Sequence, residues 1–419
     1  MTALRARRSL LLLTCTRWFP VGLTIGVTTL IPLERGMSLS QIGVIFAVQG
    51  FVILGLELPT GGLADALGRR PILLVSAIFA IGSAVVFAFA DTFAAFVVAL
   101  VMQGVFRALD SGPLEAWYVD TARASDPLVL IEDGLAKAGA TMGLAIAAGA
   151  LISGGLIAWN PVTSVSAVSF PYWCAIPLFL LHLVATGLLV QEPGLPPHAG
   201  RWRHAMDSVM CTPRVVVDGL RTLTTSRVLL ALVLVEVFWS VGMIAFETLM
   251  PIRLAELVGG ETQAGTLLGP VSAAAWGLFA LGSVIARFAS RRIGVAWTAL
   301  LARVLNGAFI VAMGLMIGPL GLITAFLLTY TMHGAAGPMH NTLLHRQAGP
   351  SNRTIILSIN SMIAGGTRSL GLLVLGPLAE TTSTTAAILA AGALSIIGAA
   401  LYLPARGQER KVAQIPERE

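Results

Sequence analysis

Charged side chains are scarce in this chain. Lys, Arg, Asp and Glu together make up 11% of its 419 residues, whereas a soluble globular protein carries about a quarter. Hydrophobic residues make up 56%. This composition excludes a soluble enzyme of one to three domains and an intrinsically disordered chain. Gly is abundant, with 44 residues, but it has no triplet period, which excludes collagen.

Cysteine is also rare. The three cysteines, Cys15, Cys174 and Cys211, lack the CxxC spacing of redox or zinc sites, so they indicate small apolar residues rather than a disulfide framework. The chain has no Walker loop, which excludes direct use of ATP, and no GxSxG or HExxH motif. We therefore expect no enzymatic activity, no cofactor and no bound metal.

Long apolar runs are what the sequence does contain. A membrane-spanning helix needs about 20 apolar residues, and twelve segments meet this length. The segments are 9–33, 40–63, 71–90, 93–119, 134–158, 165–190, 228–252, 264–288, 294–316, 319–344, 355–379 and 384–404. The sequence thus predicts an all-α polytopic membrane protein that is embedded in a lipid bilayer.

The basic residues predict the orientation of these spans. If both termini are cytoplasmic, 21 of the 27 Lys and Arg residues fall on the cytoplasmic side, two lie outside and four lie within spans. This asymmetry follows the positive-inside rule, and it favours the cell (inner) membrane over a nucleic-acid partner. We expect a six-helix half at 1–190, a cytoplasmic linker at 191–227, a second half at 228–404 and a cytoplasmic tail at 405–419.

The two halves carry similar local patterns. The pair Gly112-Pro113 in span four recurs as Gly337-Pro338 in span ten, and the basic pair 69–70 after span two recurs as 291–292 after span eight. Equivalent positions in each half indicate a parallel internal repeat, which is typical of one transporter architecture.

One loop carries a family resemblance. The segment 61–70, GGLADALGRR, resembles the signature loop of the major facilitator superfamily, which lies between spans two and three as this one does. Its matching residues are Gly61, Asp65, Gly68, Arg69 and Arg70. The resemblance implies two six-helix halves, alternating access to a central cavity, and a fold that commonly works as a monomer.

The resemblance also implies a gating latch. Asp65 and Arg69 are four residues apart and can pair at the membrane face, and Asp120 is a plausible third partner at the end of span four. In the superfamily such a cluster latches the outward-open state. The alternative is that the arginines only anchor the loop at the cytoplasmic surface.

Ionisable residues within spans are the default functional candidates, because each unpaired charge costs at least about 2.5 kcal/mol at the bilayer centre. Arg107 resembles the buried arginine that superfamily antiporters use in proton transfer. With Asp110 it forms either a proton-sensitive pair or a fixed structural one. Glu57 and Glu115 are further candidate proton carriers, and Glu57 has local helix capping as its alternative.

A second set of residues predicts the substrate cavity. It comprises Arg17, Trp18, Glu236, Phe238, Trp239, His333 and Arg368. Arg17 has the alternative of reaching back to the membrane surface. Glu247 is interpreted as a rim residue, Arg303 with Asn306 as a structural pair, and His333 and His340 as hydrogen-bonded helix residues rather than proton carriers.

These patterns favour a proton-coupled exporter of a small hydrophobic or amphipathic compound. Its partners would then be that small molecule, protons and the bilayer. Two alternatives stay open: an importer or facilitator of a polar nutrient such as an amino acid or sugar, and a membrane receptor that uses the same fold without transport.

Overall fold

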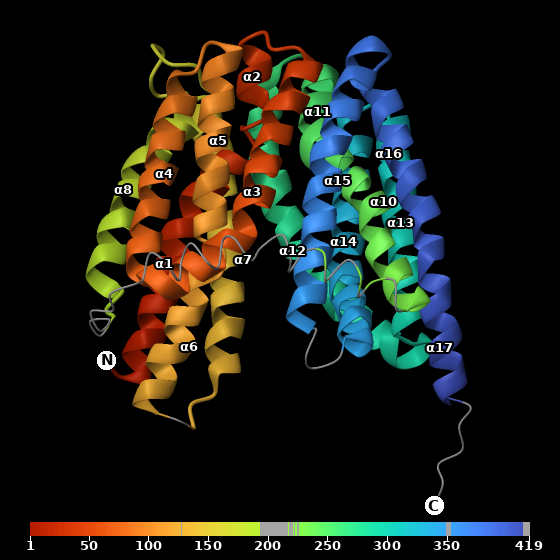
Figure 1. Ribbon diagram of the computed structural model, residues 1–419. Coiled ribbons are helices and arrows are strands. Elements are labelled where there is room, and N and C mark those ends of the chain that lie inside the picture. The colour runs from red at the N-terminus through yellow and green to blue at the C-terminus, as the bar shows by residue number, and fades with distance from the viewer. Residues whose placement is uncertain are drawn as a thin grey trace, which may run out of the picture. The chain divides into compact units, whose positions relative to one another are not determined.

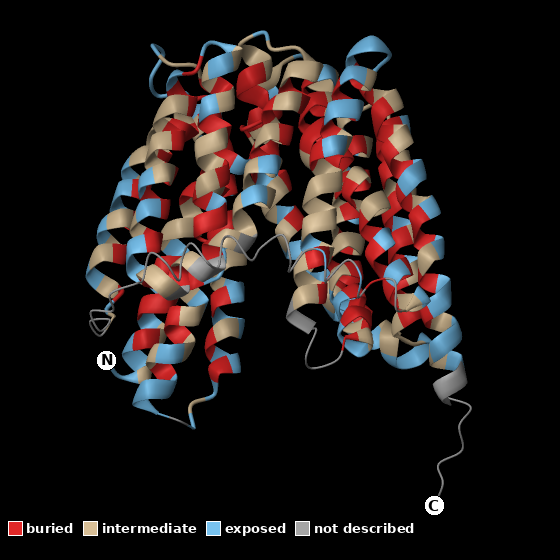
Figure 2. Cartoon of the chain, in the orientation of Figure 1, coloured by how far each residue is buried: buried red, intermediate tan, exposed pale blue. Residues whose placement is uncertain are grey.

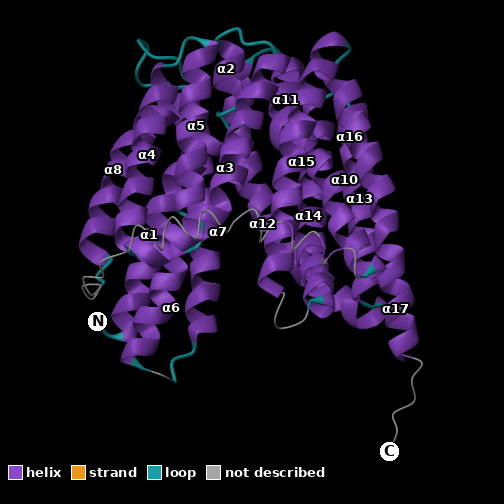
Figure 3. Ribbon diagram, viewed as in Figure 1, coloured by secondary structure: helices purple, strands orange, loops and turns teal. Residues whose placement is uncertain are grey.

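A computed structural model describes residues 1–126, 128–192, 217, 221, 223, 226–348 and 353–413. At nine of the helical positions only the backbone is described, namely 58, 61, 62, 65, 353, 354 and 411–413. Every regular element in these ranges is helical (Figure 3). Within the described ranges, twelve stretches are long and apolar enough to cross a membrane. A helix satisfies its backbone polar groups internally, as hydrocarbon requires. The expected all-α fold with twelve spans is confirmed.

The described helices fall into two compact units. Unit 1 is Met1–Met37, Val48–Thr212 and Glu261–Ala273, and unit 2 is Ser38–Ala47, Pro213–Gly260 and Ala274–Glu419. The boundary passes through α3 (Leu39–Leu67) and α12 (Glu261–Ile293), so each of these helices contributes its first turns to one unit and the remainder to the other. Neither unit is a single uninterrupted stretch of sequence.

Unit 1 is built from the N-terminal helices. Besides most of α3, they are α1 (Ala3–Ile25), α2 (Leu30–Glu34), α4 (Arg69–Phe89), α5 (Phe93–Leu109), α6 (Pro113–Ser125), α7 (Ile131–Trp159) and α8 (Phe170–Leu189) (Figure 1). Side-chain oxygens of Thr2 and Thr92 cap α1 and α5. Within the unit α1 packs along α7 and α8, and α4 packs along α5.

Unit 2 is built from the C-terminal helices. Besides most of α12, they are α10 (Arg227–Ile244), the π-helical turn η1 (Ala245–Leu249), α11 (Met250–Val258), α13 (Val295–Leu315), α14 (Pro319–Gln347), α15 (Arg353–Thr381), α16 (Thr384–Ala399), the 3₁₀ turn η2 (Ala400–Tyr402) and α17 (Leu403–Ala413). The last span continues into α17, so the expected tail at 405–419 begins inside a helix.

Large apolar side chains remain exposed along the helices of both units, between the buried stripes (Figure 2). Leu144 and Leu188 of unit 1 are 73% and 69% exposed, and Leu315 of unit 2 is 59% exposed. In water such surfaces would be unfavourable, whereas in a bilayer lipid tails cover them. The pattern agrees with a multi-pass membrane protein.

The fourth span differs from its counterpart in the second half. It is divided, because α5 ends at Leu109 and α6 begins at Pro113, with Gly112 between them at a φ of 97°. Glycine adopts this left-handed conformation without steric cost, and Pro is well tolerated at a first helical position. Pro338, at the repeated position, lies inside the continuous helix α14. The sequence repeat therefore does not impose the same break twice.

The packing of α1 on α7 depends on Gly149. A Cβ at this position would lie 2.3 Å from the carbonyl oxygen of Phe19, which is backbone and cannot rotate away. We expect Gly149→Ala to lower the melting temperature of the purified protein, because the two helices must separate to admit the methyl group. Gly155, on the same helix, has open space around the Cβ position, so Gly155→Ala should leave melting unchanged. Equal melting of the two variants would contradict this account.

Candidate functional site

A buried ion pair lies at the break in the fourth span. Arg17 on α1 pairs through Nε with the carboxylate of Asp110, the residue that follows α5. Their side chains are 13% and 4% exposed. The Arg17 guanidinium carbon also lies 4.1 Å from the ring centroid of Trp18 and 5.5 Å from that of Phe106. Both charges are tolerated here because each has a partner within the unit.

Two other candidate coupling residues lie around this pair. Arg107, near the end of α5, and Glu115, in the first turn of α6, are exposed, and the charges of both act on Arg17. Glu57 is half-buried on α3, where its carbonyl oxygen accepts a hydrogen bond from Thr60. The structure thus brings Arg107, Asp110 and Glu115 together around Arg17. Their part in proton coupling stays a prediction.

Unit 1 also holds polar pairs between helices whose pairing the sequence did not reveal. Gln49 on α3 donates from Nε2 to Oε1 of Gln103 on α5 at 2.5 Å, and the Thr16 hydroxyl lies 2.9 Å from His182 Nδ1. A search for charged residues within spans does not find such pairs. Their signal is weak in sequence, since a single Gln or Thr is ordinary in a membrane helix.

Unit 2 encloses a polar cluster contributed by five elements. Glu236 Oε1 on α10 lies 3.1 Å from His340 Nε2 on α14 and 3.9 Å from Arg303 Nη2 on α13. His340 Nε2 also lies 3.3 Å from Asn360 Oδ1 on α15, and His340 Nδ1 lies 2.9 Å from the hydroxyl of Tyr402. The Glu236 side chain is only 6% exposed. Glu236, expected at the cavity wall, therefore lies within buried packing.

The same cluster continues into a stack of rings. The Arg303 guanidinium carbon lies 4.2 Å from the ring centroid of Trp239, and Trp239 stacks on His333 with centroids 5.1 Å apart. Phe238, predicted beside Trp239 in the cavity, instead lies against α16, where a Cβ on Gly398 would be 2.3 Å from its own Cβ. Of these two adjacent aromatic residues, only Trp239 faces the charged cluster.

An aromatic group extends from the stack across three elements. Phe246 on η1, Trp276 and Phe279 on α12, and Tyr330 and His333 on α14 form this group. Phe246 and Tyr330 have centroids 5.4 Å apart, and Phe279 and His333 5.2 Å apart. All except Phe246 are partly exposed. The group offers ring faces and edges on which a flat apolar molecule can pack.

A charged pair lies beside the aromatic group. Glu247 on η1 and Arg368 on α15 form an ion pair at 2.8 Å, and both side chains are 28% exposed. Their charges also act on Tyr330. π-Helical turns within α-helices are frequent at functional sites. Arg368 was expected in the cavity and Glu247 at its rim. The structure joins the two residues in one ion pair, and both side chains stay partly exposed, so polar groups of a bound molecule can reach them.

Arg69 and Asp120, two residues of the predicted latch, are in contact, and their role as a latch stays a prediction. Arg69 Nη1 at the start of α4 lies 2.5 Å from Asp120 Oδ2 on α6, and Gly68 has a φ of 98° at the turn before α4. Arg70 donates to the carbonyl oxygen of Gly187 at 2.6 Å. The side chains at positions Gly61 and Asp65, which complete the predicted motif, lie outside the described residues.

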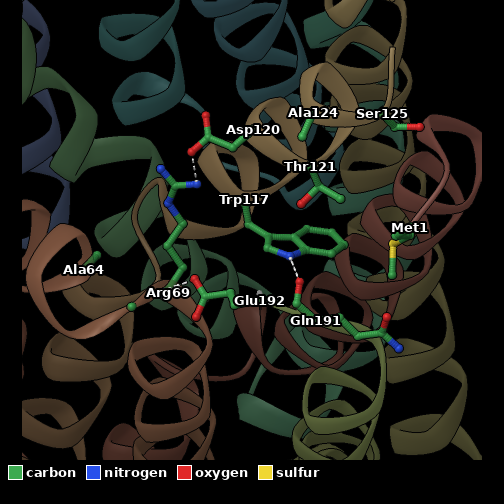
Figure 4. Close-up of a pocket in the computed structure, with 11 residues that line it drawn as sticks. Met1, Ala64, Arg69, Trp117, Asp120, Thr121, Ala124, Ser125, Gln191 and Glu192 are labelled. Carbon is green, nitrogen blue, oxygen red and sulfur yellow. Dashed lines mark hydrogen bonds and ion pairs between the residues drawn. The ribbon is translucent and has the colours of Figure 1, made fainter. Parts of the chain in front are cut away.

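Glu192 adds a contact that the motif did not reveal. Its Oε1 accepts the backbone N–H of Arg69 at 2.8 Å, and its Oε2 accepts that of Arg70 at 3.2 Å. Carboxylates stabilise helix N-termini in this way. Glu192 and Arg69 line a pocket of about 840 Å³, in which the Trp117 indole donates to the carbonyl oxygen of Gln191 (Figure 4).

Removing this carboxylate should loosen the start of α4. We expect Glu192→Ala to cost about 1 kcal/mol of stability, the usual size of a lost helix cap, and to lower the melting temperature of the purified protein. Glu132→Ala, at an exposed position in the first turn of α7, is the control and should change melting less. If the two variants melt alike, Glu192 does not stabilise this turn.

Within the described ranges, no group of three or more His, Cys, Asp or Glu side chains is placed to hold a metal ion.

Comparison with known proteins points to one family. A family model described as Major Facilitator Superfamily matches residues 10–328. A crystal structure of a mutant of the nucleoside transporter NupG is similar over 95% of this chain and 99% of its own, with a TM-score of 0.78 and 12% identity. A POT family transporter in complex with 5-aminolevulinic acid is similar over 96% of each chain, with a TM-score of 0.71 and 14% identity. Comparison with curated protein sequences gives no match.

Proposed function

Because this chain belongs to the Major Facilitator Superfamily and is a transporter rather than an enzyme, we propose that it is a proton-coupled exporter of a small hydrophobic or amphipathic compound. It would work by alternating access in the inner membrane of the cell, as a monomer with both termini in the cytoplasm. The single observation that carries the coupling is the buried pair of Arg17 and Asp110.

This pair suits a proton switch. A proton on Asp110 removes the negative charge that holds Arg17, so protonation and the ion pair exclude each other. The pair lies where the fourth span is interrupted, and interrupted helices in transporters are sites of substrate and ion binding. The charges of Arg107 and Glu115 act on Arg17 as well, so they would influence how readily Asp110 binds a proton.

The aromatic group of unit 2 supports an amphipathic substrate. Partly exposed rings pack against the apolar part of a substrate, while Glu247 and Arg368 bind polar or charged groups of either sign. Ligand sites are commonly apolar with a few placed polar groups. The Arg69–Asp120 pair would act as the latch that must open during each transport cycle.

A polar-nutrient importer or facilitator is the second candidate. The accessible Glu247–Arg368 pair favours it, because a zwitterionic nutrient would bind both charges. The solved relatives named above include a nucleoside transporter and a transporter bound to 5-aminolevulinic acid, although at 12–14% identity they share only the fold.

The test is proton flux in proteoliposomes that contain the purified protein under an imposed pH gradient. A set of amphipathic compounds and polar nutrients is added in turn. We expect an amphipathic compound to alkalinise the acidic side as it exchanges for protons, and we expect Arg107→Ala to abolish that flux.

The outcomes separate the candidates. Compound movement without proton movement would overturn the coupling and favour a facilitator. Proton-linked uptake of an amino acid or sugar, with no response to amphipathic compounds, would favour the nutrient importer. Arg35→Gln, in an exposed ion pair with Asp91 of the same unit, is the control and should leave all fluxes unchanged.

A further inference from the structure

Unit 2 has a pocket of about 780 Å³ at the ends of its helices, away from the aromatic group. It lies where α12 ends and α13 begins, and α14 and α17 complete its walls. Its ionisable lining consists of three arginines, Arg346, Arg406 and Arg410, and one carboxylate, Glu409. We propose that this pocket binds a phosphate group, supplied by the head group of an anionic phospholipid.

Arg406 lies at the pocket wall and has an unused hydrogen-bond donor. Its guanidinium carbon lies 3.9 Å from the ring centroid of Trp297, a cation–π contact that holds the group flat against the pocket wall. Its Nε is buried and has no hydrogen-bond acceptor among the described residues. A buried donor without an acceptor is unfavourable, so the side chain gains stability by turning this N–H toward a phosphate oxygen in the pocket.

Arg346 and the start of α13 add two further donors. Glu409 Oε1 lies 2.5 Å from Arg346 Nη1, and Glu409 Oε2 accepts the backbone N–H of Ala296 at 3.0 Å. The turn before α13 is made by Gly294, with a φ of 87°. Both partners of Glu409 are groups that bind phosphate well, namely an arginine and a helix N-terminus. A phosphate would share or displace Glu409 there, and three arginines against one carboxylate leave the pocket positive.

The equivalent pocket of unit 1 provides the contrast. It has the same plan, with Gly68 at the turn and Glu192 accepting the first N–H groups of α4. Figure 4 shows Glu192 beside Arg69 in this pocket. The ionisable lining of that pocket includes Asp120, however, and Asp120 pairs with Arg69. That pocket therefore supplies its own anions. Two carboxylates, Asp120 and Glu192, and one arginine, Arg69, line it, whereas the excess of arginines in the unit 2 pocket leaves that pocket to take an anion from outside the chain.

A lipid is the source that fits the surroundings. The pocket lies at the ends of the candidate spans Glu261–Ile293 and Thr384–Arg410, where head groups meet the protein. Ile293, which lines it, is 44% exposed and offers an apolar surface to an acyl chain. Basic pockets between membrane helices bind anionic head groups.

The test measures binding by native mass spectrometry and by the melting temperature of the full-length protein. The probes are phosphatidylglycerol, phosphatidylcholine and glycerol 3-phosphate. We expect phosphatidylglycerol to bind and to raise the melting temperature, with little effect of phosphatidylcholine. The double variant Arg406→Gln/Arg410→Gln should weaken phosphatidylglycerol binding at least tenfold.

The matched control removes the same charge outside the pocket. Arg287→Gln/Arg291→Gln alters two exposed arginines of α12 and should leave binding unchanged. Equal losses in both double variants, or equal binding of the two lipids, would overturn the site. Glycerol 3-phosphate binding as tightly as phosphatidylglycerol would overturn the lipid source while supporting the phosphate site. Without added lipid, each variant should melt at the same temperature as the wild-type protein, which confirms that it folds.

Discussion

Asp110→Asn should abolish proton-driven transport and destabilise the protein. Asn cannot carry the charge that holds Arg17, so the guanidinium is left buried without its counter-ion. Removing one partner of a buried pair costs about 3–5 kcal/mol. We expect a lower melting temperature, and proteoliposomes in which the compound no longer drives proton flux.

The double variant Arg17→Gln/Asp110→Asn separates stability from coupling. It removes both charges and leaves two amides that can hydrogen-bond to each other, so much of the lost stability should return. Proton flux should stay absent, because the titrating group is gone. The exposed pair Arg35–Asp91 serves as the control, since the corresponding Arg35→Gln/Asp91→Asn variant should change stability by about 1 kcal/mol or less.

Two results would contradict this account. If the double variant melts no higher than Asp110→Asn, the two residues do not act as a pair. If Asp110→Asn retains wild-type proton flux, the proton binds elsewhere, and Glu115 and Glu57 become the carboxylates to replace next.

Glu236→Gln should destabilise unit 2 more than any other loss of a carboxylate in that unit. Arg303 is 3% exposed, and its Nε and Nη1 find no hydrogen-bond partner among the described residues. Glu236 supplies the negative charge closest to it, and a Gln side chain does not replace that charge. We expect a large fall in melting temperature, equivalent to about 3–5 kcal/mol.

Glu247→Gln is the matched control for this prediction. Glu247 also lies on the seventh span and also pairs with an arginine, but its side chain is 28% exposed instead of 6%. The lower burial of this pair weakens the penalty for an unpaired Arg368, so the melting temperature should fall much less. Glu236→Gln/Arg303→Gln should recover part of the loss. Equal effects of the two single variants would show that burial does not govern these pairs.

The spans were predictable because their signal is local. An apolar run of about 20 residues is by itself long enough to cross hydrocarbon as a helix, so the expected segment 71–90 became α4 (Arg69–Phe89) and 294–316 became α13 (Val295–Leu315). The signature motif was also local, and the family it resembles is the one whose model matches. The helix break at Gly112 could not be predicted from the Gly-Pro pair alone, because the same pair at 337–338 leaves α14 continuous.

The partners of the buried charges were not predictable. Asp110 was considered only with Arg107, three residues away, whereas its ion pair is with Arg17, 93 positions earlier in the chain. Glu236 looked like a cavity residue until α13 and α14 brought Arg303 and His340 to it. Glu192 belongs to no recognisable sequence motif, yet its carboxylate caps the N-terminus of α4.

The sequence by itself determined that this protein is helical, that its described part has twelve stretches able to span a membrane, and that similar motifs recur in the two halves of the chain, because hydrophobic runs and repeated motifs act along the chain. Only the tertiary structure decided which charges meet. An ion pair such as Arg17–Asp110, or a carboxylate that caps a distant helix N-terminus, depends on how the helices pack. The sequence offers many carboxylates that could pair with a buried arginine, but packing brings only a few of them within contact distance.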